Sequence, residues 1–326
     1  MAFHSGFVCI LGRPNAGKST LLNALVGEKL AIVSPKPQTT RNRILGILQI
    51  EKIKKLSGQV ILLDTPGVHR PDTSLGRKMM AEVEAGLEGC DLILLMIDAK
   101  RKPDPSDQMV FDLVKRSQTP AFLLLNKIDL LSEKSKLLAL IDQYSKLQSF
   151  EEVIPLSARK REGLDLLLEK MLRALPEGPR YFPDDQLTDQ PVRFMAGEII
   201  REQVLLATNE EVPHATTVII ETFEEGTRLT RISAAIFCER EGQKTILVGK
   251  GGQMLKKIGT AARQRIEELV GTKVFLELFV KVRAGWRESH EFVEELDWRR
   301  QLERLTEKTE LMGSMPSGSA RRSRAR

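Results

Sequence analysis

Gly12-Arg13-Pro14-Asn15-Ala16-Gly17-Lys18-Ser19 lies between an apolar run at residues 7–11 and a helix-like run at residues 20–26. This is the order of strand, loop and helix that a phosphate-binding loop requires. Glycines at this spacing let consecutive backbone N–H groups point at phosphate oxygens. Lys18 supplies a charge for the β- and γ-phosphates, and Ser19 supplies a hydroxyl ligand for Mg²⁺. The pattern predicts a phosphate-binding P-loop and a nucleoside triphosphate ligand.

Two motifs that follow later strands indicate how the phosphates and the base are held. Asp64-Thr65-Pro66-Gly67 closes an apolar run at residues 60–63, so Asp64 is expected to hold Mg²⁺ through a water and the Gly67 N–H to meet the γ-phosphate. Asn126-Lys127-Ile128-Asp129 closes the run at residues 121–125. The carboxylate of Asp129 can accept two hydrogen bonds from guanine, and adenine lacks that donor pair. The motifs therefore favour a guanine nucleotide.

A third motif, Ser157-Ala158, follows the apolar run at residues 153–156, and its Ala158 N–H is expected to meet guanine O6. Each short motif alone is equally consistent with an ordinary turn after a strand. However, all of these motifs occur in the expected order along the chain, and each motif follows an apolar strand. This arrangement excludes the interpretation that all of them are ordinary turns. The predicted GTP-binding residues are Gly12, Arg13, Pro14, Asn15, Ala16, Gly17, Lys18, Ser19, Thr20, Asp64, Thr65, Pro66, Gly67, Val68, Asn126, Lys127, Ile128, Asp129, Ser157 and Ala158.

Apolar runs alternate with helical patterns through the first half of the chain. The runs are near-continuously hydrophobic, as buried parallel strands are, which predicts a doubly wound, mostly parallel α/β sheet with its ligand at the carboxyl ends of the strands. The expected strands are residues 7–11, 44–50, 60–63, 92–97, 121–125 and 153–156, with 44–50 as an antiparallel edge strand. The expected helices are residues 20–26, 75–87, 106–116, 133–147 and 163–174.

The break Pro176-Glu177-Gly178-Pro179 marks a domain boundary. We expect a GTP-binding domain over residues 1–178 and a linker over residues 179–192. An α+β domain with the order α, β, β, α, α, β follows over residues 193–288, including a helix over 193–207, strands over 217–223, 231–240 and 273–283, and a helix over 253–269. A C-terminal helix is expected within residues 289–311, and a disordered basic tail over residues 312–326.

The second domain contains a Gly-rich loop, Gly249-Lys250-Gly251-Gly252, that leads into a helix. A G-x-x-G loop of this kind marks KH domains, which clamp about four nucleotides of single-stranded nucleic acid. Residues 240–287 contain 11 basic and 4 acidic side chains, a net charge of +7. This excess favours RNA binding over an ordinary Gly-rich turn or a solvated helix face. The predicted RNA-binding residues are Gly249, Lys250, Gly251, Gly252, Lys256, Lys257 and Arg263.

Composition agrees with a protein of the cytoplasm. The chain has 326 residues, of which 41% are hydrophobic, enough for a core in each of two domains. Its three cysteines, Cys9, Cys90 and Cys238, lack paired spacing, so we expect reduced buried thiols. No apolar run has the length of a membrane span, and the N-terminus lacks the core of a signal peptide.

Along nearly its whole length the chain resembles the Era family of bacterial Ras-like GTPases, which carry a C-terminal type II KH domain. The resemblance rests on the motifs above, on Gln38-Thr39-Thr40-Arg41, on the helix that contains Phe194-Met195-Ala196 and Arg201-Glu202, and on Arg240-Glu241-Gly242-Gln243-Lys244. It implies hydrolysis of GTP to GDP, coupled to binding near the 3′ end of small-subunit (16S) ribosomal RNA during assembly of the small ribosomal subunit. It also implies a monomer with occasional peripheral association with the inner membrane.

Ras-like enzymes orient the attacking water with a glutamine at the position of Val68, and valine cannot form that hydrogen bond. We therefore assign catalysis to Lys18, Thr40, Asp64 and Gly67, with Mg²⁺ held by Ser19, Thr40 and Asp64; Thr39 is the alternative to Thr40. Resemblance to cation-dependent GTPases suggests a K⁺ ion at Asn15. Arg41 and Arg43 are interpreted as solvated charges, so no arginine finger and slow intrinsic turnover are expected.

Two other classes of function compete with a GTPase that switches an RNA-binding domain. In one, the chain is an RNA-binding module in which GTP only stabilises the fold. In the other, it is a regulatory GTPase recruited to membranes through the tail Arg321-Arg322-Ser323-Arg324-Ala325-Arg326. RNA affinity that ignores the bound nucleotide would favour the first alternative.

Overall fold

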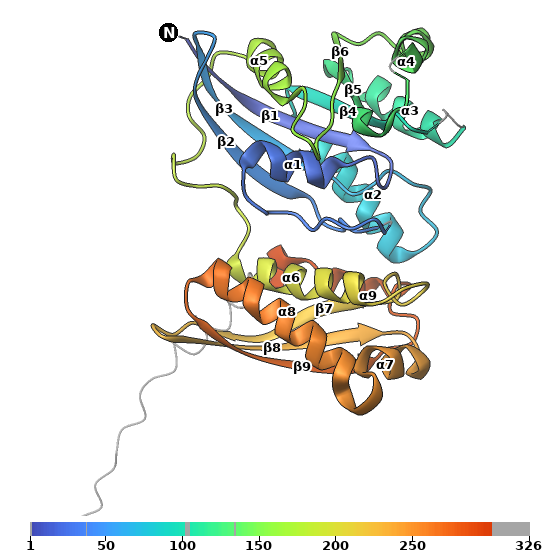
Figure 1. Cartoon of the computed structure of the whole chain (residues 1–326), viewed down its shortest axis with the longest axis vertical. Coiled ribbons are helices and arrows are strands. Elements are labelled where there is room, and N and C mark those ends of the chain that lie inside the picture. Colours follow the sequence, from blue (N-terminus) through green and yellow to red (C-terminus); the bar gives the residue numbers. More distant parts are fainter. Residues whose placement is uncertain (1, 37, 102–104, 134, 302–326) are drawn as a thin grey trace, which may run out of the picture.

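The computed structural model describes residues 2–36, 38–101, 105–133 and 135–301, which form two domains stacked one above the other (Figure 1). The N-terminal domain is built on one six-stranded sheet and the C-terminal domain on one three-stranded sheet. The predicted basic tail lies outside the described residues.

The N-terminal sheet has the strand order β2-β3-β1-β4-β5-β6. Only β2 runs antiparallel to its neighbour, as expected for an edge strand. The carboxyl ends of β1, β3, β4, β5 and β6 therefore meet at one edge, where a doubly wound sheet binds its ligand. The strands are β1 (Phe3–Gly12), β2 (Ile44–Ile53), β3 (Leu56–Asp64), β4 (Leu92–Asp98), β5 (Ala121–Asn126) and β6 (Glu152–Pro155).

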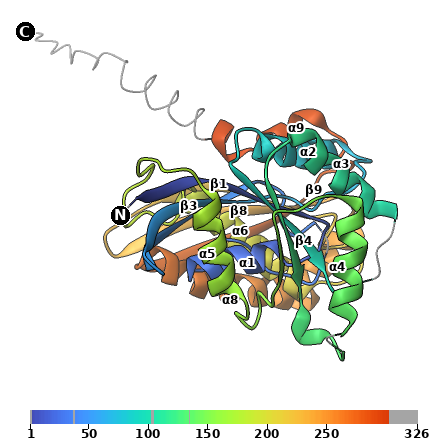
Figure 2. The same ribbon diagram turned by 90° about the horizontal axis from the view of Figure 1, so that it is seen from above.

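Helices cover both faces of this sheet (Figure 2). Helices α1 (Lys18–Val26) and α5 (Leu164–Ala174) pack on one face. Helices α2 (Ser74–Leu87), α3 (Gln108–Ser117) and α4 (Ser135–Leu147) pack on the other. Short 3₁₀ turns at Pro105–Asp107 and Ile128–Leu130 precede α3 and follow β5. Because both faces are buried, the strands are hydrophobic throughout rather than alternating, which is the pattern read from the sequence.

The C-terminal domain packs three helices on one face of a sheet with the order β7-β8-β9. Strands β7 and β8 are antiparallel, and β8 and β9 are parallel. Its elements are α6 (Val192–Ala207), β7 (Thr217–Glu224), β8 (Leu229–Cys238), α7 (Glu241–Val248), a 3₁₀ turn at Lys250–Gly252, α8 (Gln253–Val270), β9 (Lys273–Val282) and α9 (His290–Glu295). The predicted order α, β, β, α, α, β is confirmed.

The C-terminal helix expected within residues 289–311 is interrupted in its described part. Helix α9 ends at Glu295, and a second helical segment begins at Trp298 after a turn. Phe292 and Val293 on α9 are buried against Leu75 and Met79 of α2, so this short helix joins the two domains. Burial against the other domain, rather than helix propensity, therefore fixes where α9 lies.

The predicted linker runs along the N-terminal domain. Gln59 bonds the backbone of Tyr181 and Phe182 through both ends of its side-chain amide. Further along, the Thr188 hydroxyl donates to the Leu45 carbonyl at 2.6 Å. The segment thus lies against β2 and β3 and fixes the path by which the chain enters α6.

Candidate nucleotide and RNA sites

The P-loop joins the end of β1 to the start of α1 at the carboxyl edge of the sheet. Gly17 has φ +106°, and a Cβ there would lie 2.2 Å from Asn126 Nδ2, so only glycine fits. The Asn126 amide also donates to the Ala16 carbonyl at 2.8 Å. The P-loop is therefore held from behind by the second nucleotide motif, with its front surface left for the ligand.

Lys18 is a buried cation at the centre of this loop. Its ammonium donates to the carbonyls of Gly12 and Arg13, each at 3.1 Å. Burial lowers the pKa of Lys18 to about 8, although the nearby Asp64 carboxylate opposes that shift. Because the ammonium group is removed from water, an anionic ligand beside it would stabilise its charged form strongly.

Three oxygen-bearing side chains meet beside Lys18. Ser19 Oγ lies 2.8 Å from Thr40 Oγ1 and donates to Asp64 Oδ2 at 2.6 Å. Burial raises the pKa of Asp64 to about 6, and its Oδ1 is buried with no hydrogen-bond partner among the described residues. Hard oxygen donors with an unsatisfied carboxylate are the chemistry that Mg²⁺ prefers, so these residues fit the ion.

A continuous hollow runs from the P-loop to the base-selecting motifs. Its phosphate end is lined by Lys18, Ser19, Thr40 and Gly67 together with Gln38. Its other end is a cavity of about 560 Å³ that reaches Asn126, Lys127, Asp129 and Ser157. Both ends share the residues Asn15, Gly17, Thr20, Val33 and Ser34. The sequence did not single out Val33, Ser34, Pro35, Leu130 and Arg159, which line the second cavity without any motif of their own.

Asp129 lies at the far end of this cavity. Its Oδ1 accepts a 2.6 Å hydrogen bond from Ser157 Oγ, which orients the carboxylate. Lys127 donates to the Asn15 carbonyl and to Asp98, both at 2.7 Å, and so ties the base-selecting motif to the P-loop. The geometry is that of a preformed pocket for a planar base with paired donors.

Several predicted residues support the hollow from behind instead of facing it. The Ala158 N–H, expected at guanine O6, donates to Asn126 Oδ1 at 3.0 Å, because that buried amide oxygen needs a donor. Thr65 is buried and donates to the Ile10 carbonyl at 2.8 Å. Val68 is 2% exposed and its side chain packs in the core with α2, while its backbone N–H donates to the Gly12 carbonyl at 3.1 Å.

The interpretation of Arg41 as a solvated charge is wrong. Arg41 is 6% exposed, and its guanidinium lies over the Trp286 ring and donates to the Thr216 carbonyl at 2.8 Å. These partners belong to the C-terminal domain, more than 170 positions away in the chain, so no local pattern could have shown them. Arg43 also donates to protein, through its side chain to the Ala85 carbonyl.

The G-x-x-G loop lies between α7 and α8 at the end of the C-terminal domain away from the nucleotide (Figure 1). Gly251 has φ +58°, and a Cβ there would meet nothing within 4 Å, so the loop presents its backbone to open space. Lys250, Lys256 and Lys257 are exposed around it. These three cations and the open backbone form a surface that suits a phosphate chain.

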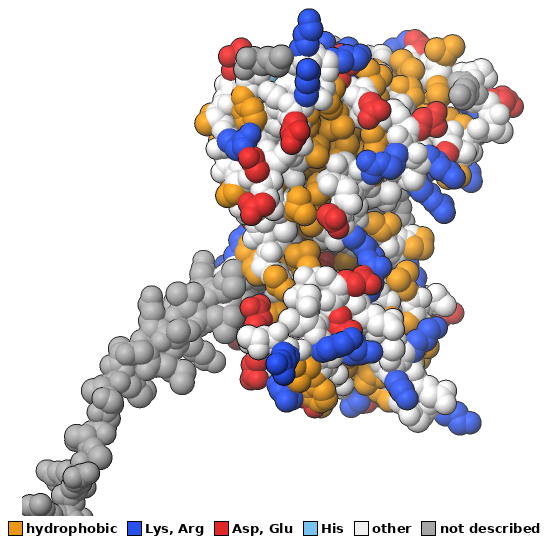
Figure 3. All heavy atoms as spheres, turned by 60° about the vertical axis from the view of Figure 1, so that its left-hand side comes forward, with side chains coloured by type: hydrophobic (Ala, Val, Ile, Leu, Met, Phe, Trp, Pro, Cys, Tyr) orange, Lys and Arg blue, Asp and Glu red, His pale blue; other side chains and the backbone are white. Residues whose placement is uncertain are grey.

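The RNA-binding role of Arg263 stays a prediction, and its side chain also makes a contact within the KH domain. Its guanidinium donates to Glu267 at 2.8 Å, and that carboxylate also accepts from the backbone N–H of Val274. Arg263 therefore belongs to a network that joins α8 to β9. On the face drawn in Figure 3, Lys and Arg side chains are interspersed with Asp and Glu over both domains.

The comparisons with known proteins agree with this geometry. Residues 7–127 match the family of 50S ribosome-binding GTPases, and residues 211–287 match the KH domain family. The chain is 48% identical to the GTPase Era of Ruminiclostridium cellulolyticum over 300 residues, covering 92% of this chain and 99% of the relative. The chain belongs to the Era family of GTPases. Like other members of the Era family it hydrolyses GTP.

Further Era proteins show the same extent of similarity. The GTPase Era of Syntrophus aciditrophicus is 48% identical over 298 residues, 91% of this chain and 95% of the relative. Two solved Era structures each match with a TM-score of 0.85 and 41% identity over 90% of this chain and 98% of theirs. One is Era in complex with MgGDPNP and nucleotides 1506–1542 of 16S ribosomal RNA, and the other is a variant of Aquifex aeolicus Era bound to GDP and AlF₄⁻. The similarity spans both the GTPase and the KH domain.

Among the described residues, no helix of the structure has the length and apolar character needed to cross a membrane. Within the same ranges, no group of three or more His, Cys, Asp or Glu side chains is arranged to hold a metal ion. A Mg²⁺ ion bound with help from hydroxyls and phosphates, as proposed below, needs no such group.

Proposed function

We propose that this protein uses its nucleotide state to control binding of single-stranded RNA near the 3′ end of small-subunit ribosomal RNA, during assembly of the small ribosomal subunit. One observation carries the proposal: the segment that lines the phosphate end of the hollow also contacts the KH domain. This segment, residues 32–36 and 38–41, is called switch I from here on and lies against α6. Helix α2, which begins at Ser74 a few residues after Gly67, lies against α9. A change at the γ-phosphate therefore has a direct path to the RNA-binding domain.

Ser19, Thr40 and Asp64 are the residues that we propose to hold Mg²⁺. Ser19 Oγ lies 2.8 Å from Thr40 Oγ1 and 2.6 Å from Asp64 Oδ2. The other carboxylate oxygen of Asp64 is buried and has no hydrogen-bond partner among the described residues. The related Era structure with MgGDPNP supports the choice of metal. When bound, Mg²⁺ would offset the negative charge that develops on the phosphate oxygens.

The other residues of the site bind and orient the nucleotide and exclude water. Lys18 holds the β- and γ-phosphates, the Gly67 backbone N–H donates to the γ-phosphate, and Asp129 accepts the two donors of guanine. Val68 is buried and apolar, so it does not orient the attacking water. That task is left to backbone groups and to the ordered switch I.

We also propose a K⁺ ion at Asn15, which lines both parts of the hollow and is positioned by a 2.9 Å hydrogen bond from its amide to the Pro35 carbonyl. Hydrolysis by the full chain should run faster in KCl than in NaCl at equal ionic strength, because only an ion of the right size would fit beside the phosphates. The steady-state rate in each salt is the measurement. Equal rates in the two salts would exclude the potassium site.

In the KH domain, the proposed RNA contacts are the backbone of Gly249–Gly252 and the side chains of Lys250, Lys256 and Lys257. The choice of RNA is supported by the related Era structure, which holds nucleotides 1506–1542 of 16S ribosomal RNA. A monomer that works in the cytoplasm, with peripheral association with the inner membrane, is proposed on family resemblance.

The test is a titration of labelled single-stranded RNA, matching the 3′ end of small-subunit ribosomal RNA, with the full chain bound to GDP or to GDPNP. We expect tighter binding in the GDPNP form, because switch I then holds the KH domain in one orientation. Identical affinities would instead favour GTP as a purely structural ligand.

A further inference from the structure

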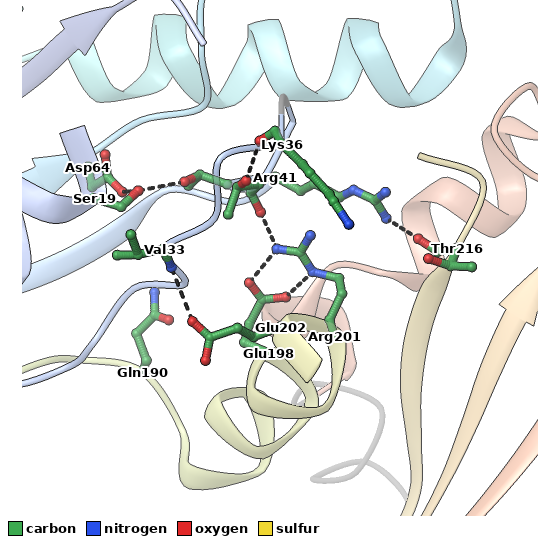
Figure 4. A network of polar contacts seen from close by, with 12 residues as sticks. Ser19, Val33, Lys36, Arg41, Asp64, Gln190, Glu198, Arg201, Glu202 and Thr216 are labelled. Carbon is green, nitrogen blue, oxygen red and sulfur yellow. Dashed lines mark hydrogen bonds and ion pairs between the residues drawn. The ribbon is translucent and has the colours of Figure 1, made fainter. Parts of the chain in front are cut away.

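Switch I is attached to helix α6 of the KH domain by several polar contacts (Figure 4). The Val33 N–H donates to Glu202 at 3.2 Å, and Lys29 pairs with the same carboxylate at 2.6 Å. The Lys36 ammonium donates to the carbonyls of Leu205 and Thr208. These carbonyls lie at the C-terminal end of α6, where a helix leaves its acceptors open and favours a cation.

Arg201 makes the contact nearest to the proposed metal ligands. It is 2% exposed, and its Nε and Nη2 donate to the two oxygens of Glu198, each at 2.8 Å. The same Nη2 donates to the backbone carbonyl of Thr39. A planar guanidinium bound at two points by a carboxylate has a fixed direction, so this donor is aimed at one place.

Thr39 is joined by a single peptide unit to Thr40, whose hydroxyl lies 2.8 Å from Ser19 Oγ. A peptide unit is planar and rigid, so fixing the Thr39 carbonyl restricts where the Thr40 backbone begins. One rigid peptide unit therefore connects the carbonyl that Arg201 contacts to the residue whose hydroxyl belongs to the proposed metal site.

We infer that Arg201 is a positioning residue for GTP hydrolysis: its guanidinium, oriented by Glu198, holds the Thr39 carbonyl and thereby keeps the Thr40 hydroxyl directed at Mg²⁺. The inference rests on the proposed role of Ser19, Thr40 and Asp64. Helix α6 of the KH domain then completes the nucleotide site through this contact.

The same contact explains how RNA binding can reach the nucleotide. Helix α8 begins at the G-x-x-G loop, and its Ile258, Ala262 and Ile266 pack in one core with Ile200 and Val204 of α6. A shift of α8 on binding RNA would therefore be passed to α6 by close packing, and from α6 to Thr39 through Arg201.

The test compares Arg201→Lys and Arg201→Ala with wild type in the full chain. Lysine keeps a positive charge beside Glu198 but lacks the fork that bonds both Glu198 and Thr39. We expect kcat to fall, and the Mg²⁺ concentration at half-maximal hydrolysis to rise, by roughly ten-fold each, the loss equivalent to one hydrogen bond from a charged donor. GDP affinity should stay unchanged, because the contacts proposed for the base and for Lys18 do not involve Thr39.

Arg173→Ala is the matched control, because Arg173 pairs with a glutamate of its own helix, Glu169, at 3.0 Å on α5 and does not contact switch I. It should leave all three quantities at the wild-type value. Thr40→Ala, measured in parallel, separates this inference from the proposed site. If Thr40→Ala raises the Mg²⁺ requirement and Arg201→Lys does not, the inference is overturned and the metal site stands.

Two further outcomes would also overturn the inference. If Thr40→Ala has no effect on the Mg²⁺ requirement, the proposed metal site is wrong and Arg201 has nothing to position. If Arg201→Lys loses GDP affinity as strongly as it loses hydrolysis, the pair with Glu198 serves only to maintain the fold.

Discussion

At the scale of single residues, burial gives Lys18 and Asp64 the chemistry that the site needs. Burial lowers the pKa of the Lys18 ammonium and raises that of the Asp64 carboxyl, so each group is less stable in its charged form than in water. A bound triphosphate with Mg²⁺ supplies the opposite charge to each. The ligand and its ion would therefore relieve the electrostatic cost of burying these two groups.

Replacing Lys18 by alanine should lower the rate of GTP hydrolysis at least ~100-fold, because it removes a preorganised charge from the phosphates. Lys18 donates to P-loop carbonyls of the GTPase domain, so the RNA affinity of the GDP form should change little. A steady-state phosphate-release assay measures the effect. Hydrolysis at the parent rate would show that the P-loop assignment is wrong.

Val68→Gln tests the claim that position 68 is structural. Val68 is 2% exposed within the core beneath α2, so a glutamine amide placed there would lack hydrogen-bond partners and cost about 1–3 kcal/mol of stability. We expect a lower urea midpoint and no gain in turnover. A ten-fold faster enzyme with unchanged stability would show that this side chain faces the γ-phosphate after all.

At the scale of elements, the strands and their terminal motifs could be predicted because the signals are local. Each motif directly follows an apolar run, and parallel strands bring their carboxyl ends to one edge. The interpretation of Arg41 was wrong, because its partner in the other domain leaves no local pattern. The roles of Ala158 and Arg263 stay predictions, although each also has a protein partner that local pattern does not reveal. The contact of Arg201 with Thr39 joins residues 162 positions apart and could not be foreseen.

The G-x-x-G loop gives a prediction at this scale. Gly251→Asp should weaken RNA binding roughly five-fold, since a carboxylate close to a phosphate costs about 1 kcal/mol per contact even in water. Gly251→Asn is the matched control: it tolerates the same left-handed backbone and adds no charge. RNA titrations of both variants, with GTP hydrolysis as a check on folding, are the measurement. Equal losses in the two variants would assign the effect to shape rather than charge.

At the scale of the whole molecule, the KH domain contacts both switch I and helix α2 of the GTPase domain. Switch I lies on α6, and α2 packs against Trp286, Phe292 and Val293 in a shared apolar cluster. Arg299 also pairs with Glu82 of α2 at 3.2 Å. A molecule connected in this way has two binding sites joined by one interface, which is what coupling between GTP and RNA requires.

The most direct test of that coupling is the reciprocal binding measurement. The affinities of the full chain for GDPNP and for GDP are determined without RNA and with saturating RNA. Linkage requires that RNA changes the ratio of the GDPNP and GDP affinities by one particular factor. This is the factor by which RNA affinity differs between the GDPNP form and the GDP form, and we expect it to exceed about five. A ratio that RNA leaves unchanged would contradict the account, because the two sites would then be energetically independent.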